Sequence, residues 1–279
     1  MTVYFNGEFV DKENVSISPD DRGFVFGDGV YEVLRAENGQ LFQADAHFRR
    51  LRRSLHEIKI HGVDVDELRG AVSSLLYHND LQEGHAKVYL QVTRGAAPRQ
   101  HAFPEASTEP TVYATASAHE PPVEKWKQGV STILYPDQRW ARCDIKSTAL
   151  LPNVLANQAA MEQEAFEAIL VREGFVTEGS HSTVLGVVDD TVMTHPLTNR
   201  ILPSTTRMLA LNLCDRLDIS VEEVPIPTDD LPDLDELLLL GTTTGVMPVV
   251  QVDDWAVGDG TPGAITRELQ AAFQELEPA

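Results

Sequence analysis

The apolar positions in the first half of the chain follow the two-residue period of strands in some segments and the longer period of helices in others. In VYFNGEFV, two short apolar runs flank Asn6-Gly7, a pair that accepts positive φ, so this segment is predicted to form a hairpin. Further strands are predicted at VYEVLRA, KVYLQVTRG and TVYATAS, and helices over AHFRRLRRSLHEI and 65–78, with Asp45 as the N-cap of the first helix. This mixture predicts an α+β domain. The apolar face of the first helix comprises Phe48, Leu51, Leu55 and Ile58.

A polar stretch separates this half from the rest of the chain. The segment SAHEPPVEKWK contains two prolines and no apolar periodicity, which is typical of an inter-domain linker. We expect the linker at 118–125, between a small N-terminal domain, 1–117, and a larger C-terminal domain, 126–279, that carries Lys146. In the second domain, strands are predicted at VSTILY, AFEAILV, STVLGVV and ELLLLG, and helices after Lys146, over 205–216 and over 263–275.

Composition narrows the class of protein. A chain of 279 residues with 42% hydrophobic content is long enough for one large globular domain or two ordinary ones. No run of about 18 apolar residues occurs and the N-terminus lacks the segments of a signal peptide, so we expect no membrane span and a cytoplasmic location. Cys143 and Cys214 have neither a disulfide framework nor the spacing of a zinc site, and no metal site is expected.

The charge is strongly acidic. The net charge of −21, from 43 acidic and 22 basic residues, opposes binding to nucleic acid or an anionic membrane, so neither is an expected partner. The acidic residues are spread along the chain, and only six of the basic residues are lysines. This pattern suits a surface adapted to high salt, where screening removes much of the self-repulsion.

Lys146 is the only lysine after Lys127, and it lies next to an apolar run in RCDIKSTALL. An amine in an apolar setting incurs a desolvation penalty unless it is neutral or paired. One interpretation is a surface lysine whose amine reaches water beside Asp144. The other is an amine of lowered pKa that forms a Schiff base with a carbonyl compound. The position alone leaves both open.

If that carbonyl compound were pyridoxal phosphate, the site would also need a carboxylate for the pyridine nitrogen and a cradle for the phosphate. In FVTEGSHSTVLG, Glu178 stands at a strand-to-turn junction. LPSTTR and LGTTTG are candidate phosphate cradles, the first because Thr205 and Thr206 open a predicted helix whose amides attract anions. Taken singly, these segments are also explained as an ordinary turn, a helix cap and a second turn.

Two basic segments are candidates for binding anions. Arg50 lies at helical spacing from Phe48 and Leu51, so its forked guanidinium can point inward to a phosphate, although most of the cluster from Arg49 to Arg53 reads as a solvated face. In PRQH, Arg99 and His101 project from one side if the backbone is extended, an arrangement that suits a carboxylate. A mobile basic loop is the alternative.

Taken together, the ordered motifs RGFVFGDGVYEV, VTRGAAPRQHAFP, RCDIKS, TEGSHS and LGTTTGVMPV make the chain resemble the fold-type IV pyridoxal-phosphate-dependent transaminases, and within them the D-amino-acid transaminases. The resemblance runs from about Tyr4 to Phe273. It implies a two-domain α+β subunit with pyridoxal phosphate between the domains, a homodimer, and amino acids and 2-oxo acids as substrates. The implied reaction moves an amino group from a D-amino acid to pyruvate or 2-oxoglutarate in a ping-pong cycle.

The resemblance also implies roles for individual residues. Lys146 matches the lysine that forms the Schiff base and then moves the proton, and Glu178 matches the partner of the pyridine nitrogen. The remaining cofactor positions match Arg50, Thr205, Thr206 and Thr242 around the phosphate and Leu202 under the ring. The positions that trap the substrate α-carboxylate match Tyr31, Arg99 and His101, the last two reaching across the dimer interface.

Some positions depart from the D-amino-acid enzymes. Gly241 stands where they have a serine and Gly245 where they have an acidic residue, and ALLPNVLA after Lys146 is more similar to branched-chain and lyase relatives. The alternatives are therefore a branched-chain L-amino-acid or (R)-amine transaminase, a lyase of the aminodeoxychorismate type, and a binding protein without enzymatic activity.

Overall fold

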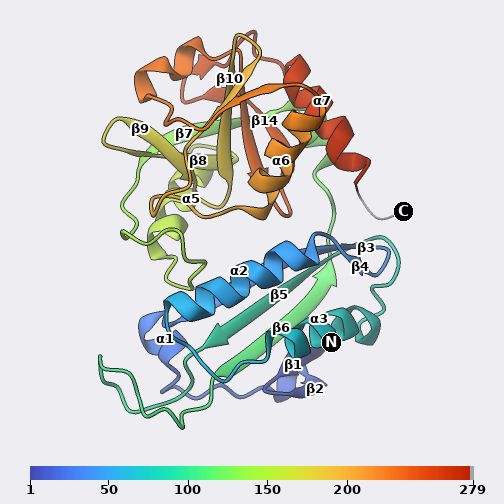
Figure 1. Ribbon diagram of the computed structural model, residues 1–279, viewed down its shortest axis with the longest axis vertical. Coiled ribbons are helices and arrows are strands. Elements are labelled where there is room, and N and C mark those ends of the chain that lie inside the picture. Colours follow the sequence, from blue (N-terminus) through green and yellow to red (C-terminus); the bar gives the residue numbers. More distant parts are fainter. Residues whose placement is uncertain (277–279) are drawn as a thin grey trace. The chain divides into compact units, whose positions relative to one another are not determined.

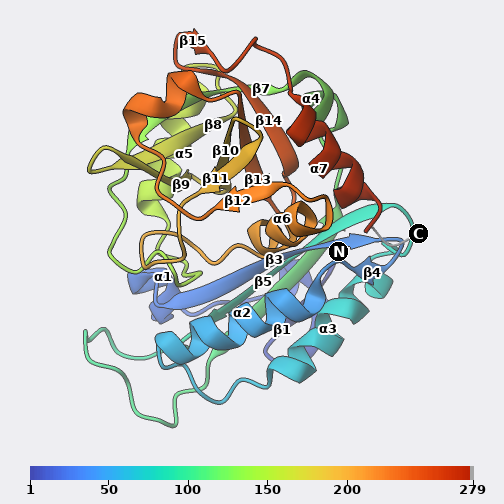
Figure 2. The same cartoon turned by 45° about the horizontal axis from the view of Figure 1, so that its top comes forward.

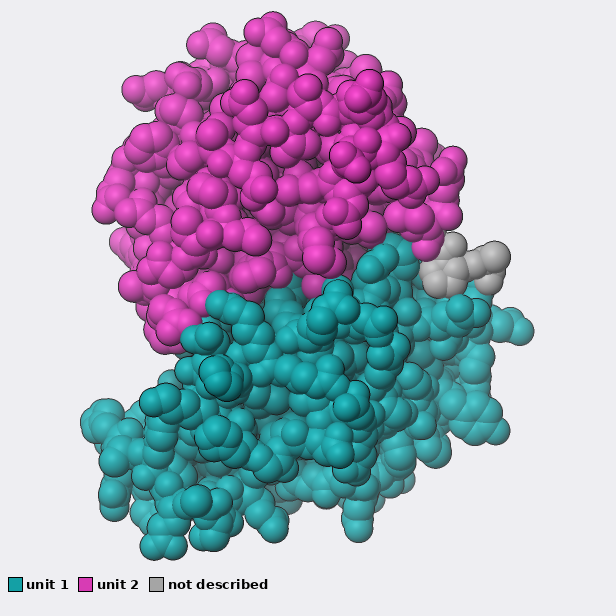
Figure 3. Space-filling view, in the orientation of Figure 1, with its two compact units in different colours: residues 1–120, 145–150, 278–279 teal, residues 121–144, 151–277 magenta. Residues whose placement is uncertain are grey.

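The computed structural model describes residues 1–276, which form two compact units (Figure 3). The first comprises Met1–Glu120 together with Ile145–Leu150, and the second comprises Pro121–Asp144 and residues 151–276. The chain leaves the first unit at Glu120, within the segment predicted as a linker, although helix α4 (Val123–Gln128) already begins inside that segment.

The first unit is built on an antiparallel sheet with strand order β2-β1-β6-β5-β3-β4 (Figure 1). The hairpin predicted at its N-terminus is confirmed, with φ of 47° at Asn6 and 96° at Gly7. The strands are β1 (Thr2–Phe5), β2 (Glu8–Asp11), β3 (Gly29–Glu37), β4 (Gln40–Leu41), β5 (His85–Thr93) and β6 (Thr111–Ala118).

Two long helices, α2 (Ala44–Glu57) and α3 (Val65–His78), cover one face of this sheet (Figures 1 and 2), and the short α1 (Arg22–Phe26) precedes β3. The α3 range matches the prediction, with the Asp64 side chain as its cap. The Asp45 N-cap prediction is wrong, because α2 is preceded by Gln43 in the left-handed region. Asp45 instead lies in the first turn, where it pairs with Arg69 of α3 at 2.5 Å.

The segment Ile145–Leu150 completes the first unit, whereas the sequence placed Lys146 in the C-terminal domain. Ile145 is buried in the core between the sheet and the helices. Residues 146–148 occupy the edge of β3 beside Val30, where the amide of Tyr31 donates to the Lys146 carbonyl (3.0 Å) and the amide of Thr148 to the Gly29 carbonyl (3.0 Å). Free backbone groups at a strand edge thus hold a segment that is distant in sequence.

The second unit contains a mixed sheet of order β12-β11-β10-β13-β14-β7-β8-β9, with β15 beside β14. The strands and helices predicted for this unit are confirmed, but β11, β12, β14 and β15 were not predicted. In β14, Gly245 opens the strand and Pro248 lies within it, and both residues argue against a strand. The strands are β7 (Val130–Pro136), β8 (Glu167–Arg172), β9 (Phe175–Gly179), β10 (Thr183–Val188), β11 (Thr191–Thr194), β12 (Ser220–Glu222), β13 (Glu236–Gly241), β14 (Gly245–Val252) and β15 (Trp255–Ala256). Besides α4, the helices of this unit are α5 (Leu151–Glu162), α6 (Thr205–Arg216) and α7 (Ala264–Gln274), and a 3-10 turn covers Thr228–Asp233. The other 3-10 turn, Lys12–Asn14, lies in the first unit.

None of the helices within residues 1–276 combines the length and apolar character needed to cross a bilayer.

Candidate functional site

Lys146 is held by its backbone at the edge of β3, and its side chain lies over Tyr31, with Nζ 4.3 Å from the ring centroid. Asp144, the partner suggested by the sequence for a surface lysine, is bound by Arg142 at 2.9 Å. In the described part of the first unit, no carboxylate lies within ion-pair distance of Nζ. The Lys146 amine is therefore half-buried and has no ion-pair partner among the described residues of the first unit.

Behind this lysine, a buried carboxylate holds Arg50. Glu32 of β3 accepts from Arg50 Nε and Nη2, each at 2.8 Å, and its Oε2 lies 2.8 Å from His47 Nδ1. Although burial acts in the opposite direction, Arg50 and His47 lower the pKa of Glu32 to about 2. Burial lowers the pKa of His47, so its imidazole is neutral near pH 7. Glu32 thereby fixes the direction of a guanidinium that the sequence assigned to a phosphate.

Arg99 and His101 lie together on the ring of Phe26. The guanidinium carbon of Arg99 is 5.1 Å from that ring's centroid, and the two aromatic centroids of His101 and Phe26 are 5.5 Å apart. Both side chains are exposed in the single chain. Tyr31, the third predicted member, contacts Tyr89 (5.8 Å between centroids) and Lys146. Within one chain, the three predicted carboxylate ligands thus form two groups.

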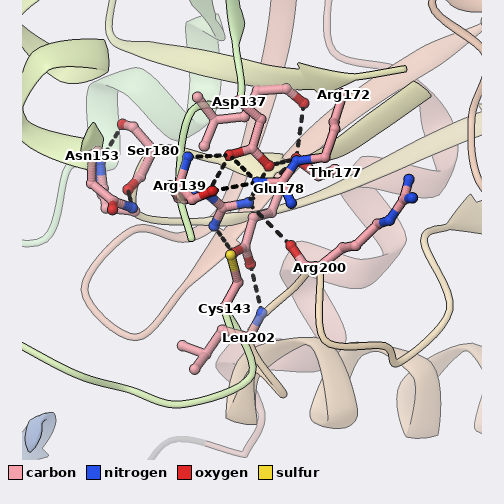
Figure 4. Close-up of polar contacts among 12 residues, drawn as sticks. Asp137, Arg139, Cys143, Asn153, Arg172, Thr177, Glu178, Ser180, Arg200 and Leu202 are labelled. Atoms are coloured by element: carbon pink, nitrogen blue, oxygen red, sulfur yellow. Dashed lines mark hydrogen bonds and ion pairs between the residues drawn. The ribbon is translucent and has the colours of Figure 1, made fainter. Parts of the chain in front are cut away.

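In the second unit, Glu178 lies near the end of β9, inside a network of charged groups (Figure 4). Arg139 forms an ion pair with Glu178 and a two-pronged pair with Asp137, through Nε–Oδ1 at 2.9 Å and Nη2–Oδ2 at 2.8 Å. The amide of Leu202 donates to Glu178 Oε2 at 3.0 Å. Burial raises the pKa of Glu178, while Arg139 and the Leu202 amide act against that shift. Each carboxylate oxygen of Glu178 has a partner and keeps capacity to accept another hydrogen bond.

Asp137 fixes the orientation of Arg139. Asp137, whose pKa falls to about 2 because hydrogen bonds from Arg139 outweigh burial, also pairs with Arg172 at 3.0 Å and accepts from the Thr177 hydroxyl at 2.9 Å. The pKa of Arg139 is raised by its carboxylate neighbours even though burial opposes this. It is therefore a permanent cation beside Glu178.

Thr205 and Thr206 are buried at the first two positions of α6, after Ser204, whose side chain caps the helix by accepting from the Arg207 amide at 3.1 Å. The first amides of a helix attract anions, so these residues suit a phosphate. Thr242 is half-buried in the separate turn between β13 and β14.

The same turn explains one departure from the D-amino-acid enzymes. Gly245 has φ of 68°, and a Cβ added there would lie 2.9 Å from the Trp126 ring, whose Nε1 donates to the Thr244 carbonyl at 2.7 Å. A larger residue at this position would be strained and would displace the ring. Gly241 is less restricted, since a Cβ there would meet the Thr244 hydroxyl at 3.1 Å.

Each unit by itself carries groups of a kind that pyridoxal phosphate requires. They comprise an amine for its carbonyl carbon, a buried carboxylate for its ring nitrogen, and a guanidinium with a helix N-terminus for its phosphate. Each of these groups is held by its own unit through the contacts described above.

Sequence reasoning missed four residues that orient these groups: Glu32, His47, Asp137 and Arg139. Glu32 and His47 had a signal, because in β3 Glu32 lies on the same face as the apolar Val30 and Leu34, and His47 shares an inward helical face with Arg50. Asp137 and Arg139 lie after β7 in a segment without periodicity, and only the folded structure brings Arg139 to Glu178.

Comparison with known proteins matches the chain to aminotransferases. The profile described as amino-transferase class IV matches residues 29–252. The chain is 41% identical over 274 residues to a D-alanine aminotransferase of Staphylococcus haemolyticus and 42% identical over 278 residues to that of Bacillus licheniformis, in each case over 98% of this chain and 96% of the relative. A branched-chain amino acid aminotransferase from Escherichia coli superposes with a TM-score of 0.88 at 24% identity, covering 99% of this chain and 93% of the other. This last likeness concerns the fold and confirms the predicted architecture.

Proposed function

The chain belongs to the class IV aminotransferases, and we propose that it moves an amino group from a D-amino acid to a 2-oxo acid such as pyruvate or 2-oxoglutarate. Enzymes of this family depend on pyridoxal phosphate, the cofactor predicted from the sequence. The observation that carries the D-amino-acid assignment is the pair Arg99 and His101, seated together on Phe26. The full-length likeness to D-alanine aminotransferases supports it.

Lys146 acts in two ways in this proposal. Its Nζ anchors the cofactor, and as a free amine it takes the proton from the substrate α-carbon and returns it at the other end of the reacting system. The bound cofactor supplies an electron sink for the negative charge left at that carbon. The backbone hydrogen bonds between Lys146 and β3 hold the backbone of this residue in place. The amine can therefore carry out both tasks while the backbone from which it extends stays fixed.

Glu178 would hold the proton on the cofactor's ring nitrogen, and Arg139 directs the Glu178 carboxylate and opposes the rise in its pKa that burial causes. Arg50, Thr205, Thr206 and Thr242 would hold the phosphate, and Leu202 would contact the ring. Because Glu32 neutralises part of the charge of Arg50, most of the attraction for a phosphate dianion in this proposal comes from the α6 amides and hydroxyls.

Replacement of Arg99 by alanine should raise the KM for D-alanine and weaken the preference for D-amino acids. The loss of a charged hydrogen bond to the substrate carboxylate costs about 1.5–3 kcal/mol, or roughly ten- to a hundred-fold in kcat/KM. Half-reaction spectra with D-alanine, L-leucine and (R)-1-phenylethylamine measure this directly. Arg69→Ala, which removes an exposed arginine that pairs with Asp45, is the matched control.

Unchanged use of D-alanine by the Arg99→Ala enzyme would move the carboxylate site elsewhere and favour a branched-chain or (R)-amine transaminase. Restoration of the aldehyde form of the cofactor by pyruvate or 2-oxoglutarate, after an amino donor has been added, separates a transaminase from a lyase.

We also propose that the working enzyme is a homodimer. Arg99 and His101 are exposed and contact Phe26, whereas Tyr31 contacts Tyr89 and Lys146, so a second copy can bring the three ligands together. On α5, Leu151, Val154, Leu155 and Met161 are exposed at helical spacing, an apolar row that a partner would cover. Sedimentation equilibrium should give twice the mass of the 30.8 kDa chain, and a monomeric active enzyme would contradict the proposal. A cytoplasmic location is in keeping with the free thiols of Cys143 and Cys214.

Adaptation to salt is the remaining element of the proposal. The melting temperature should rise from low salt to about 1 M potassium chloride and then level off, because the Debye length falls to about 3 Å at 1 M and the acidic residues no longer repel one another. Calorimetry over this range measures the effect. A melting temperature that does not change with the salt concentration contradicts salt adaptation. A melting temperature that keeps rising in proportion to the salt concentration above about 1 M indicates that the salt acts by exclusion from the protein surface and not by screening.

A further inference from the structure

The segment RGFVFGD carries two buried or half-buried charged residues that the proposed chemistry does not use, Arg22 and Asp28. Only 4% of Arg22 is exposed, and its Nε lies 2.8 Å from Asp28 Oδ2. The same carboxylate binds Arg94 through Nε at 2.8 Å and Nη2 at 2.9 Å. Although burial opposes it, the hydrogen bonds from Arg94 and Arg22 lower the pKa of Asp28. One carboxylate thus joins two guanidinium groups in a buried cluster.

Arg22 extends from this cluster to the loop that carries the proposed carboxylate ligands. Its Nη1 donates to the backbone carbonyls of Gln100 at 2.6 Å and Ala102 at 3.3 Å. These two carbonyls stand on either side of His101, and Gln100 directly follows Arg99. A single guanidinium therefore fixes the backbone around both ligands.

The side chains of the loop are seated by the last residue of the same short helix. The Phe26 ring lies 4.8 Å from the guanidinium carbon of Arg22 and contacts both Arg99 and His101. Helix α1 thus holds the loop in two ways. Arg22 binds the backbone of the loop, and Phe26 contacts the side chains of the loop.

Arg94 anchors the base of the loop. Its Nη1 and Nη2 donate to the carbonyls of Lys59 (2.9 Å) and Ile58 (2.6 Å) at the end of α2, and its guanidinium carbon lies 3.7 Å from the centroid of the Phe103 ring. The amide of Arg22 donates to the carbonyl of Gly95 at 3.0 Å. Asp28 connects this base to Arg22, so the two ends of segment 94–103 share one rigid support.

We propose that Arg22 is a positioning residue for substrate recognition, which holds Arg99 and His101 in the arrangement that receives the amino acid's carboxylate. The inference rests on the proposed role of that pair. It predicts that loss of Arg22 weakens the binding of substrates with an α-carboxylate. The binding of an amine without one, such as (R)-1-phenylethylamine, should not change. Positioning of this kind acts on KM, whereas Lys146 and Glu178 act on kcat.

Arg22→Lys is the first test, because lysine keeps the charge but its ammonium lacks the planar fork that reaches Asp28 and two carbonyls together. The holoenzyme variant should show a KM for D-alanine raised about ten-fold, a kcat within about two-fold, and faster hydrogen exchange of the amides between Gly95 and Phe103. Arg35→Lys is the matched control, since Arg35 is equally buried, pairs with Glu37 at 3.0 Å and lies over the Phe42 ring.

Phe26→Leu is the second variant and decides the matter if Arg22→Lys does not fold. It retains an apolar residue but removes the ring shared by Arg99 and His101, and it should raise the same KM. Phe24→Leu, at an exposed position two residues away, is its control.

Combination with Arg99→Ala separates positioning from a general structural role. If Arg22 acts through Arg99, adding Arg22→Lys to the Arg99→Ala enzyme should change KM by less than about two-fold. A full additional ten-fold rise in the double variant would overturn the proposal, as would faster loop exchange with an unchanged KM in Arg22→Lys alone. If Arg99→Ala itself leaves KM unaltered, the proposed carboxylate site fails and the positioning role falls with it. An altered KM in Arg99→Ala beside an unaltered KM in Arg22→Lys removes only the positioning role.

Discussion

Replacement of Lys146 by alanine is expected to abolish transamination while leaving the fold intact. Loss of the proton-transferring amine alone lowers kcat by about 10²–10⁴-fold, and loss of the cofactor's anchor lowers it further. The fold should survive because Lys146 is joined to β3 through its carbonyl, which alanine retains, and because its side chain is half-buried and leaves no enclosed cavity. Initial rates with D-alanine and pyruvate, together with a melting curve, measure both effects.

Lys87→Ala is the control for this experiment, since Lys87 is an exposed lysine of β5 in the same unit. Borohydride reduction of the purified enzyme followed by peptide mapping should place the cofactor on Lys146. A label on any of the other five lysines, or turnover by Lys146→Ala within ten-fold of the parent, would contradict the assignment.

Replacement of Glu178 by glutamine is expected to lower kcat by about 10²–10³-fold with little change in KM. Removal of one preorganised electrostatic stabiliser has an effect of about this size. Glutamine keeps the shape and can still accept from the Leu202 amide, but it removes the negative charge that balances a protonated ring nitrogen. It also leaves Arg139 with Asp137 as its remaining carboxylate partner, so the loss of thermal stability should be modest.

Steady-state kinetics with D-alanine test this expectation, with Glu173→Gln as the control, because Glu173 is an exposed glutamate that pairs with the side chain of Arg200, a residue that reaches the network only through its backbone carbonyl. A kcat within a few-fold of the parent would show that Glu178 is a structural partner of Arg139 and not a group of the reaction.

Much of the local structure could be predicted from the sequence because it depends on residues close together in the chain. The Asn6-Gly7 turn and the starts of α3 and α6 are decided within a few residues by allowed φ and by unpaired helix amides. Strand β14 escaped prediction because its pairing with β13 tolerates Pro248, which sequence rules exclude from a strand interior.

The candidate site divides in the same way. Lys146 and Glu178 could be found in the sequence, since a lone lysine beside an apolar run and an acidic residue in an ordered motif are local signals. Their surroundings could not: Arg139 comes to Glu178 from a segment 39 residues away, and Arg22 reaches backbone carbonyls 78 and 80 residues further along.

The sequence by itself therefore indicated the amine and the carboxylate proposed to take part in the reaction, the kinds of element that carry them and the acidic character of the surface. Only the tertiary structure decided that the Lys146 segment joins the first unit at the edge of β3, that Glu32 directs Arg50, and that Arg22 supports the loop of Arg99 and His101. The physical reason is the separation along the chain between the residues that interact. Periodicity and turn chemistry report the conformation of neighbouring residues, whereas a free strand edge or a buried charge selects its partner from the whole chain according to which segment can satisfy its hydrogen bonds.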